Sequence, residues 1–263
     1  MATHKAPAAP WCFRPEDISL QDFQDALGRY EELIDQVSSS KPAKSGQKTL
    51  AELDRYRYLD APSLFSSAPR RQAMQLEHIK TLVEWKLKHG KFRPTLMKLV
   101  TSNDEACAKE IVQSAVDRYK QDKDPQAAID TLAKLKGVGP ATASLLLAVH
   151  DPGNVIFFAD EAFYWLCCSG RKDTIKYNAK ECRELQRASQ SLAKRLGVQA
   201  VDIERVAYVI MNEVPSITDT VNKALVGEQT KAADQQKPAK KRKHHGLVEE
   251  NVGVRRSKRG RPA

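Results

Sequence analysis

The sequence predicts an all-α domain followed by a disordered basic tail. Apolar residues recur at spacings of three and four along most of residues 1–226, and no stretch alternates apolar and polar residues with a period of two. Residues 227–263 lose this periodicity and hold few apolar side chains, so they cannot bury enough surface to offset the entropy cost of ordering. We therefore expect one helical domain over 1–226, with disorder at 1–12, and a disordered tail over 227–263.

The first half of the domain contains two clear helical patterns and a polar loop. After Pro15–Asp17, the apolar residues from Phe23 to Leu33 are spaced by four and three. Residues 38–48 are polar and contain Pro and Gly, which predicts a flexible loop. The apolar residues from Leu76 to Leu87 line one face of a helix that Gly90 should end.

The second half is marked by residues that start helices. Ser102–Glu105 matches a capping box before a helix that runs to Tyr119. Asp124 is a favourable cap, and Pro125 a favourable first residue, for a helix that runs to Leu135. Further helices are expected at 140–149, 160–168, 178–196 and 202–212.

Composition excludes several classes of protein. The chain has 263 residues, of which 41% are hydrophobic and 29% charged, so it has enough apolar material for a core. No apolar run approaches the ~18 residues of a membrane span, and residues 1–10 lack the apolar centre of a secretory signal, so we expect no membrane partner. The five cysteines and six histidines show no metal-binding spacing, and no nucleotide-binding glycine loop occurs. We therefore expect neither a metal nor a cofactor.

The net charge of +10 is concentrated in the tail. Residues 231–263 hold 11 Lys and Arg against 3 Asp and Glu, a net charge of +8, whereas the preceding 230 residues carry only +2. A basic tail on a nearly neutral domain favours a polyanionic partner or a nuclear import signal.

The segment Leu135–Thr142, with the sequence LKGVGPAT, predicts a tight turn between two helices that binds an anion. Gly137 and Gly139 are expected to adopt positive φ and present backbone amides, and Pro140 to start the next helix. The free amides and positive dipole end of that helix suit a DNA phosphate. The expected DNA contacts are Lys136, Gly137, Val138, Gly139, Ala141 and Thr142. The alternative is a turn whose glycines serve packing alone.

This turn resembles the helix-hairpin-helix motif of the DNA glycosylase superfamily. Members of that superfamily follow the hairpin with a loop, a short apolar run and a catalytic aspartate that opens the next helix. Here residues 155–159 form the apolar run and Asp160 follows it. The similar region covers roughly residues 76–168. Its phrases WKLKHGKFRP (85–94), GVGPATAS (137–144) and FFADEA (157–162) more narrowly resemble the Amun-like group of eukaryotic proteins.

The resemblance implies a helix-hairpin-helix glycosylase-like domain that binds duplex DNA and acts as a monofunctional N-glycosylase. Asp160 would stabilise the sugar cation as the glycosidic bond breaks, with Glu161 as the weaker alternative. Nearby aromatic side chains would wall the base pocket: Phe157, Phe158, Phe163, Tyr164 and Trp165, with Trp85 more remote.

Two departures from the superfamily limit what the resemblance implies. Ala141 stands where lyase members carry their imine-forming lysine, so we expect no lyase chemistry. The chain also lacks the four clustered cysteines of the iron–sulfur members.

Two alternatives stay open from the sequence. Asp160 could be an ordinary helix N-cap and the aromatic residues core, which would make the protein a non-catalytic DNA- or chromatin-binding protein on the same scaffold. The domain could instead bind another protein, with the tail serving only nuclear import.

The tail carries two basic runs, residues 237–243 and residues 255–262, which together fit an import signal, and the second run also contains a DNA-binding pattern. The tail resembles a bipartite nuclear localisation signal at Lys240, Lys241, Arg242, Lys243, Arg255 and Arg256. Such a signal implies an import receptor as partner and a nuclear location. The tail also resembles the core of an AT-hook at Arg259, Gly260 and Arg261. In an AT-hook, two arginines enter the narrow minor groove of A·T-rich DNA. The alternative for the import signal is a solvated charge run without a receptor. The alternative for the AT-hook core is a role in the import signal or in nonspecific phosphate contact alone.

Overall fold

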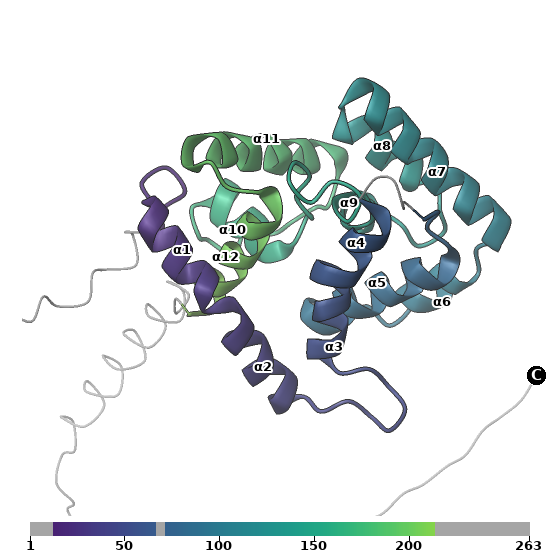
Figure 1. The fold of residues 1–263 in the computed structure, drawn as a ribbon, viewed down its shortest axis with the longest axis horizontal. Helices are drawn as coiled ribbons and strands as arrows, with labels where there is room; N and C mark the ends of the chain where they lie inside the picture. Colours follow the sequence, from purple (N-terminus) through teal and green to yellow (C-terminus); the bar gives the residue numbers. More distant parts are fainter. Residues whose placement is uncertain (1–12, 67–71, 214–263) are drawn as a thin grey trace, which may run out of the picture. The chain divides into compact units, whose positions relative to one another are not determined.

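The computed structural model describes residues 13–66 and 72–213, which Figure 1 shows as a set of packed helices. No strand occurs in these two ranges, which confirms the all-α prediction. The expectations for 1–12 and for the tail at 227–263, including both basic runs at 240–261, lie outside the described residues. The elements are α1 (Leu20–Gly28), α2 (Tyr30–Ser40), α3 (Leu50–Arg55), the π-helix η2 (Tyr56–Asp60), α4 (Ala61–Phe65), α5 (Leu76–His89), α6 (Leu96–Thr101), α7 (Glu105–Asp122), α8 (Pro125–Leu132), α9 (Pro140–Ala148), α10 (Asp160–Cys168), α11 (Ala179–Leu196) and α12 (Ala200–Glu213).

Local signals place several helix ends where the sequence predicts them. The Asp124 carboxylate accepts a hydrogen bond from the amide of Gln126, and Pro125 is the first residue of α8. Asn178 caps α11 through its side chain, and Gly90 follows the last residue of α5. These ends agree because each depends on a side chain close in sequence to the backbone groups that it satisfies.

Two helix boundaries in the second half differ from the prediction. Asp104, not Ser102, caps α7, because its carboxylate accepts from the amide of Cys107, whereas Ser102 ends α6. α8 ends at Leu132 and not at Leu135, and the chain then turns toward α9.

The N-terminal segment forms two helices where one was predicted. Arg29 alone separates α1 from α2, and its guanidinium binds the Glu213 carboxylate at the end of α12 through two hydrogen bonds of 2.8 Å. α2 continues through Ser40, so the predicted loop at 38–48 is wrong for its first three residues. The loop instead occupies 41–49.

Residues 50–65 form a helical run that the sequence did not predict. It starts at a capping box in which Thr49 and Glu52 exchange side-chain and backbone hydrogen bonds. η2 then inserts a π-helical turn, which buries the adjacent residues Arg57 and Tyr58 together. This insertion breaks the 3.6-residue period of apolar positions, so no helical pattern is visible in the sequence.

The core is built around α9. Every residue from Ala141 to Ala148 is buried, and the helix packs against α5, α8 and α11. A helix without a polar face must be enclosed by its neighbours. α10 in turn packs against α11 and α12, so the connection from α9 to α10 passes through the interior.

A buried ion pair joins η2 to α12. Nη2 of Arg57 donates to Oε2 of Glu204 over 3.0 Å, and both side chains are almost completely buried. The hydroxyl of Tyr58 donates to the same carboxylate over 3.3 Å. If the two side chains separated, each charge would be buried without a partner, which is strongly unfavourable. The ion pair therefore holds Glu204 next to Arg57.

Candidate functional site

Residues 155–159, here called the strap, lead from α9 to Asp160. Each of the three central amides donates to a buried side chain of a different helix: Ile156 to Gln186 of α11 (3.3 Å), Phe157 to Glu204 of α12 (2.6 Å) and Phe158 to Ser144 of α9 (2.8 Å). The carbonyl of Ile156 also accepts from the Gln186 amide over 2.6 Å. An irregular segment anchored at three consecutive residues is immobilised, so the residue that follows it has a fixed position.

Asp160 is the first residue of α10 and not its N-cap. Ala159 occupies the cap position and offers no side-chain acceptor, so the interpretation of Asp160 as an ordinary cap is wrong. Its carboxylate oxygen Oδ1 instead accepts a hydrogen bond of 2.8 Å from the hydroxyl of Tyr177. Tyr177 has φ of 54°, a left-handed conformation that costs free energy for a tyrosine. The backbone is therefore strained at the residue that binds Asp160.

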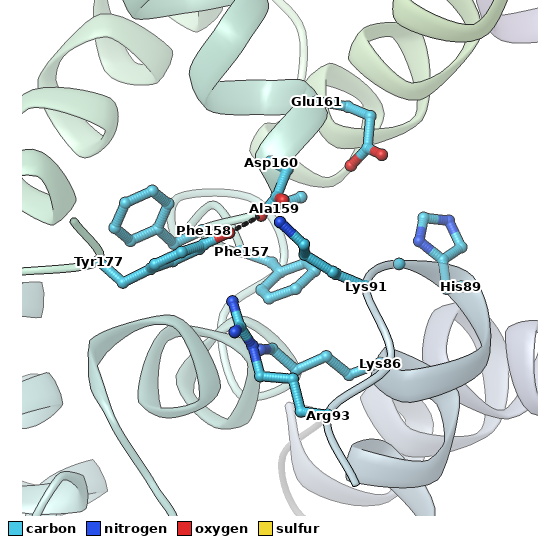
Figure 2. Close-up of a pocket in the computed structure, with 11 residues that line it drawn as sticks. Lys86, His89, Lys91, Arg93, Phe157, Phe158, Ala159, Asp160, Glu161 and Tyr177 are labelled. Atoms are coloured by element: carbon cyan, nitrogen blue, oxygen red, sulfur yellow. Dashed lines mark hydrogen bonds between the residues drawn. The ribbon is translucent and has the colours of Figure 1, made fainter. Parts of the chain in front are cut away.

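A pocket opens at Asp160 between the strap and the C-terminal end of α5 (Figure 2). Its cavity volume is about 30 Å³. Three basic side chains from α5 and the following loop line this space. Lys91 reaches toward Asp160, whereas Lys86 and Arg93 point toward the rings of Phe157 and Tyr177. The lining residues are Lys86, His89, Gly90, Lys91, Arg93, Phe157, Phe158, Ala159, Asp160, Glu161 and Tyr177.

Burial shifts the proton affinity of three pocket side chains. It lowers the pKa of Lys86 to about 8, with a further lowering from Arg93 and an opposing effect from Asp160. It raises the pKa of Glu161 to about 7, and the nearby Asp160 charge adds to this increase. It also lowers the pKa of His89 to about 3, so this imidazole is neutral. The pocket thus contains an acid and an amine that both exchange protons near neutral pH.

The loop after α5 adds an exposed aromatic residue beside the pocket. Phe92 is 71% exposed and lies in the chain between Lys91 and Arg93, both of which line the pocket. The Arg93 guanidinium carbon lies 5.1 Å from the centre of the Tyr177 ring. Aromatic rings flanked by cations can stack on bases while the charges contact phosphates.

The aromatic wall differs from the one that the sequence predicts. Phe157 and Phe158 line the pocket as expected, and Tyr177 joins them. Trp85 and Trp165 are core residues whose indole nitrogens donate to Asp54 and to the carbonyl of Phe13 respectively. Phe163 is also buried in the core, and Tyr164 does not line the pocket.

The turn between α8 and α9, residues 133–139, contains two glycines with different surroundings. Gly137 has φ of 76°, and a Cβ atom there would lie 2.8 Å from Cβ of Leu99. Gly139 has φ of −92°, so the expectation of positive φ is wrong at this position. A Cβ atom on Gly139 would meet nothing within 4 Å. Packing therefore requires glycine at 137 and leaves open space at 139.

Two backbone amides at the start of α9 have no hydrogen-bond partner in the described part of the chain. Asn103 holds one side of the turn, since its side chain both accepts from the Lys136 amide (2.8 Å) and donates to the Lys136 carbonyl (3.0 Å). Among the residues that the structure describes, the amides of Gly139 and Ala141 make no hydrogen bond. They lie at the positive end of α9, and Gly139 is exposed.

The other predicted contacts of the turn are largely inaccessible. The side chains of Val138, Ala141 and Thr142 are buried, and the Thr142 amide is used by the carbonyl of Gly139. Lys136 is exposed. A ligand at this turn would therefore meet backbone amides and one lysine, and not the side chains of residues 138, 141 and 142.

Helix α9 connects the turn with the pocket. Its first residues present the free amides, and Ser144, one turn later, holds the strap at Phe158. Asp160 and Glu161 lie at the start of a helix, as predicted from the sequence, whereas Lys86, Lys91, Arg93 and Tyr177 were not predicted as site residues. The segment 85–94 is rich in basic residues, which weakly indicates Lys86, Lys91 and Arg93 as site residues. Tyr177 has no signal in the sequence.

Residues 13–66 and 72–213 contain no cluster of three His, Cys, Asp or Glu side chains that could hold a metal ion. Within the same residues, every helix is too short or too polar to cross a bilayer. No protein-family model, curated protein or solved structure matches the chain.

Proposed function

We propose that the chain is a nuclear DNA-binding protein that acts as a monofunctional DNA N-glycosylase, with the α8–α9 turn as a helix-hairpin-helix motif and Asp160 as the catalytic carboxylate. The observation that carries this proposal is Asp160 itself. It follows an immobilised strap, accepts a hydrogen bond from a strained tyrosine and faces a pocket lined by three cations. The strained backbone at Tyr177 lowers the stability of the fold. A carboxylate held in a fixed position is what a catalytic site requires.

The α8–α9 turn supports binding of the DNA backbone. A phosphate oxygen would accept hydrogen bonds from the unpartnered amides of Gly139 and Ala141 at the positive end of the α9 dipole. The exposed Lys136 adds a positive charge beside them. The open space at Gly139 allows an oxygen atom to approach the backbone closely.

Asp160 supports the chemical step. Departure of a base develops positive charge on the deoxyribose ring, and a carboxylate held in place stabilises that charge without reorganising. The C1′–N bond breaks and its electron pair leaves with the base. Water then adds to C1′, and the proton that it loses balances the one that the departing base takes up, so the products are the free base and an abasic site. Lys91 and Arg93 line the same pocket and would contact the phosphates that flank an extruded nucleotide.

The proposal is tested by a base-release assay with the full-length protein. Duplexes that each carry one uracil, alkylated, oxidised or mismatched base are incubated with enzyme and treated with alkali, which cleaves the strand at abasic sites. We expect release of at least one base class, and a loss of at least a hundredfold in Asp160→Asn. Asp173→Asn is the matched control, because Asp173 is exposed and does not line the pocket. Unchanged release by Asp160→Asn would remove Asp160 from the mechanism.

A non-catalytic DNA- or chromatin-binding protein is the second candidate, and the size of the pocket favours it. A cavity of about 30 Å³ holds a water molecule and not a nucleobase unless Lys86, Lys91 or Arg93 moves. Salt-sensitive binding to every duplex, with release of no base from any of them, would support this second candidate.

A further inference from the structure

α11, which runs over Ala179–Leu196, carries positive charge along its exposed face. It lies at the edge of the described helices (Figure 1). Its buried side is formed by Cys182, Leu185, Gln186, Ser189 and Leu192. Because an α-helix turns by about 100° per residue, four exposed cations lie on the opposite side within an arc of about 60°. These four residues, here called the basic stripe, are Lys180, Arg183, Arg187 and Lys194.

The positive charges of the basic stripe are not neutralised by neighbouring side chains. In the described part of the chain, the four side chains form no hydrogen bond and no ion pair. α7 has the same length, but Arg118 pairs with Asp122 there and Lys120 pairs with Asp117. α7 holds three basic and four acidic residues, whereas α11 holds five basic and two acidic residues. An exposed face that serves solubility alone mixes both signs, as α7 does.

The basic stripe is unfavourable for the free protein. Like charges that lie three or four residues apart repel each other on a helix surface, as Lys180 and Arg183 do, and as Arg183 and Arg187 do. Lys180 is also in the first turn of α11, where the helix dipole disfavours a positive charge. A bound polyanion would neutralise these charges and so account for a surface that lowers the stability of the unbound domain.

Contacts of α11 fix the position of the basic stripe relative to Asp160. On the buried side of the helix, Gln186 accepts from the amide of Ile156 in the strap over 3.3 Å and donates to its carbonyl over 2.6 Å. At the N-terminal end, Tyr177 donates to Asp160 and directly precedes the cap residue Asn178. The basic stripe therefore begins close to the pocket in the chain and leads away from it along α11.

We propose that the basic stripe of α11 binds the phosphate backbone of duplex DNA on one side of the nucleotide held at Asp160. This inference rests on the proposed DNA-binding function and adds a contact surface to the α8–α9 turn. From Lys180 to Lys194 the stripe spans about 21 Å along the helix axis, which corresponds to about six base pairs of duplex. A partner that engages all four cations must carry repeated negative charges over this length, as a DNA backbone does. Contacts to phosphates carry no sequence preference of their own.

The experiment measures the affinity of the full-length protein for a labelled duplex at several salt concentrations by fluorescence anisotropy. The test variant is Arg183→Gln/Arg187→Gln, which removes two charges from the basic stripe. Arg118→Gln/Lys120→Gln is the matched control, because it removes the same charge from the exposed face of α7. Arg183→Lys/Arg187→Lys keeps the charge of the stripe. Thermal unfolding checks that each variant folds.

We expect Arg183→Gln/Arg187→Gln to reduce the slope of log affinity against log salt concentration by about 2 and to weaken binding at least fivefold at physiological ionic strength. Arg118→Gln/Lys120→Gln and Arg183→Lys/Arg187→Lys should keep the slope of the wild type. The test variant should unfold at the same temperature as the wild type or at a higher one, because repulsion along the helix is relieved. Residues that serve folding alone would show the reverse, a lower unfolding temperature with an unchanged salt slope.

A second variant, Lys180→Gln/Lys194→Gln, tests the two ends of the basic stripe and should reduce the salt slope by a similar amount. A wild-type slope in both this variant and Arg183→Gln/Arg187→Gln, or an equal loss in the α7 control, would overturn the inference and leave the proposed DNA-binding function intact. A wild-type protein that binds no duplex at any salt concentration would refute the proposed function and the inference together.

Discussion

At the scale of single residues, the two glycines of the α8–α9 turn differ in why the position is occupied by glycine. Gly137 has positive φ and packs directly against Leu99 and Val100. Gly139 has ordinary φ and faces open space, so packing gives no reason for glycine there. A phosphate oxygen that approaches the Gly139 amide would supply the missing reason.

Substitution of each glycine by alanine should therefore separate folding from binding. Gly137→Ala is expected to lower the free energy of unfolding by about 1–3 kcal/mol, because it combines backbone strain with steric overlap. Gly139→Ala should leave this free energy within about 0.5 kcal/mol and weaken DNA binding at least fivefold. Urea denaturation and fluorescence anisotropy with a labelled duplex measure the two quantities. Full DNA affinity in Gly139→Ala would argue against a phosphate at this turn.

The pKa of Glu161 makes the stability of the protein dependent on pH. Because the folded protein raises this pKa from 4.5 to about 7, the folded state binds a proton more tightly than the unfolded chain does. The stabilisation is therefore complete below pH 4.5 and is lost as the pH rises through 7. Between pH 5 and pH 8, the free energy of unfolding should fall by about 2 kcal/mol more in the wild type than in Glu161→Gln. Parallel pH profiles of the two proteins would contradict this assignment.

At the scale of elements, the strap depends on side chains from three helices. The hydroxyl of Ser144 accepts from the amide of Phe158 over 2.8 Å, and both residues are buried. Ser189 provides a matched comparison, because its hydroxyl is equally buried and has no hydrogen-bond partner among the described residues.

Removal of these two hydroxyls should have different effects on the free energy of unfolding. Ser144→Ala leaves a buried amide unsatisfied and should lower the free energy of unfolding by about 1–3 kcal/mol. Ser189→Ala removes a hydroxyl that is buried without a partner and should be neutral or slightly stabilising. Chemical denaturation compares the two variants directly. Similar losses in both would show that the strap amide is not specifically stabilised by Ser144.

At the scale of the whole molecule, charge is divided between a nearly neutral domain and a strongly basic tail. Each phosphate that a protein neutralises adds about 0.9 to the slope of log affinity against log salt concentration. Arg259 and Arg261 are expected to contact A·T-rich minor grooves, whereas Lys240–Lys243 are expected to serve import. Arg259 and Arg261 can therefore be tested in the full chain without changing the residues that are expected to serve import.

Replacement of Arg259 and Arg261 by Gln should reduce the salt slope of duplex binding by about 2 and abolish any preference for A·T-rich duplexes. Nuclear accumulation of a fluorescent fusion should not change. The measurement is duplex affinity at several salt concentrations. An unchanged slope would place both arginines outside the DNA complex.

The sequence by itself determined the helical class, the starts of α5, α8, α9 and α11, and the position of Asp160 at the beginning of α10. These features depend on backbone groups and on side chains within a few residues of them, such as the Asp124 cap and the Pro140 start. Short elements such as η2 were not predicted. An inserted turn interrupts the regular spacing of apolar residues from which a helix is predicted.

Only the tertiary structure decided which side chains surround Asp160. Lys86 and Tyr177 lie far from it along the chain, and the fold brings all three to one pocket while it buries Trp85 and Trp165 in the core. It likewise decided that Gly139 keeps an ordinary φ and that Lys86 has a lowered pKa. Burial, charge proximity and hydrogen bonding between distant segments arise from packing, and local sequence preferences contain no information about them.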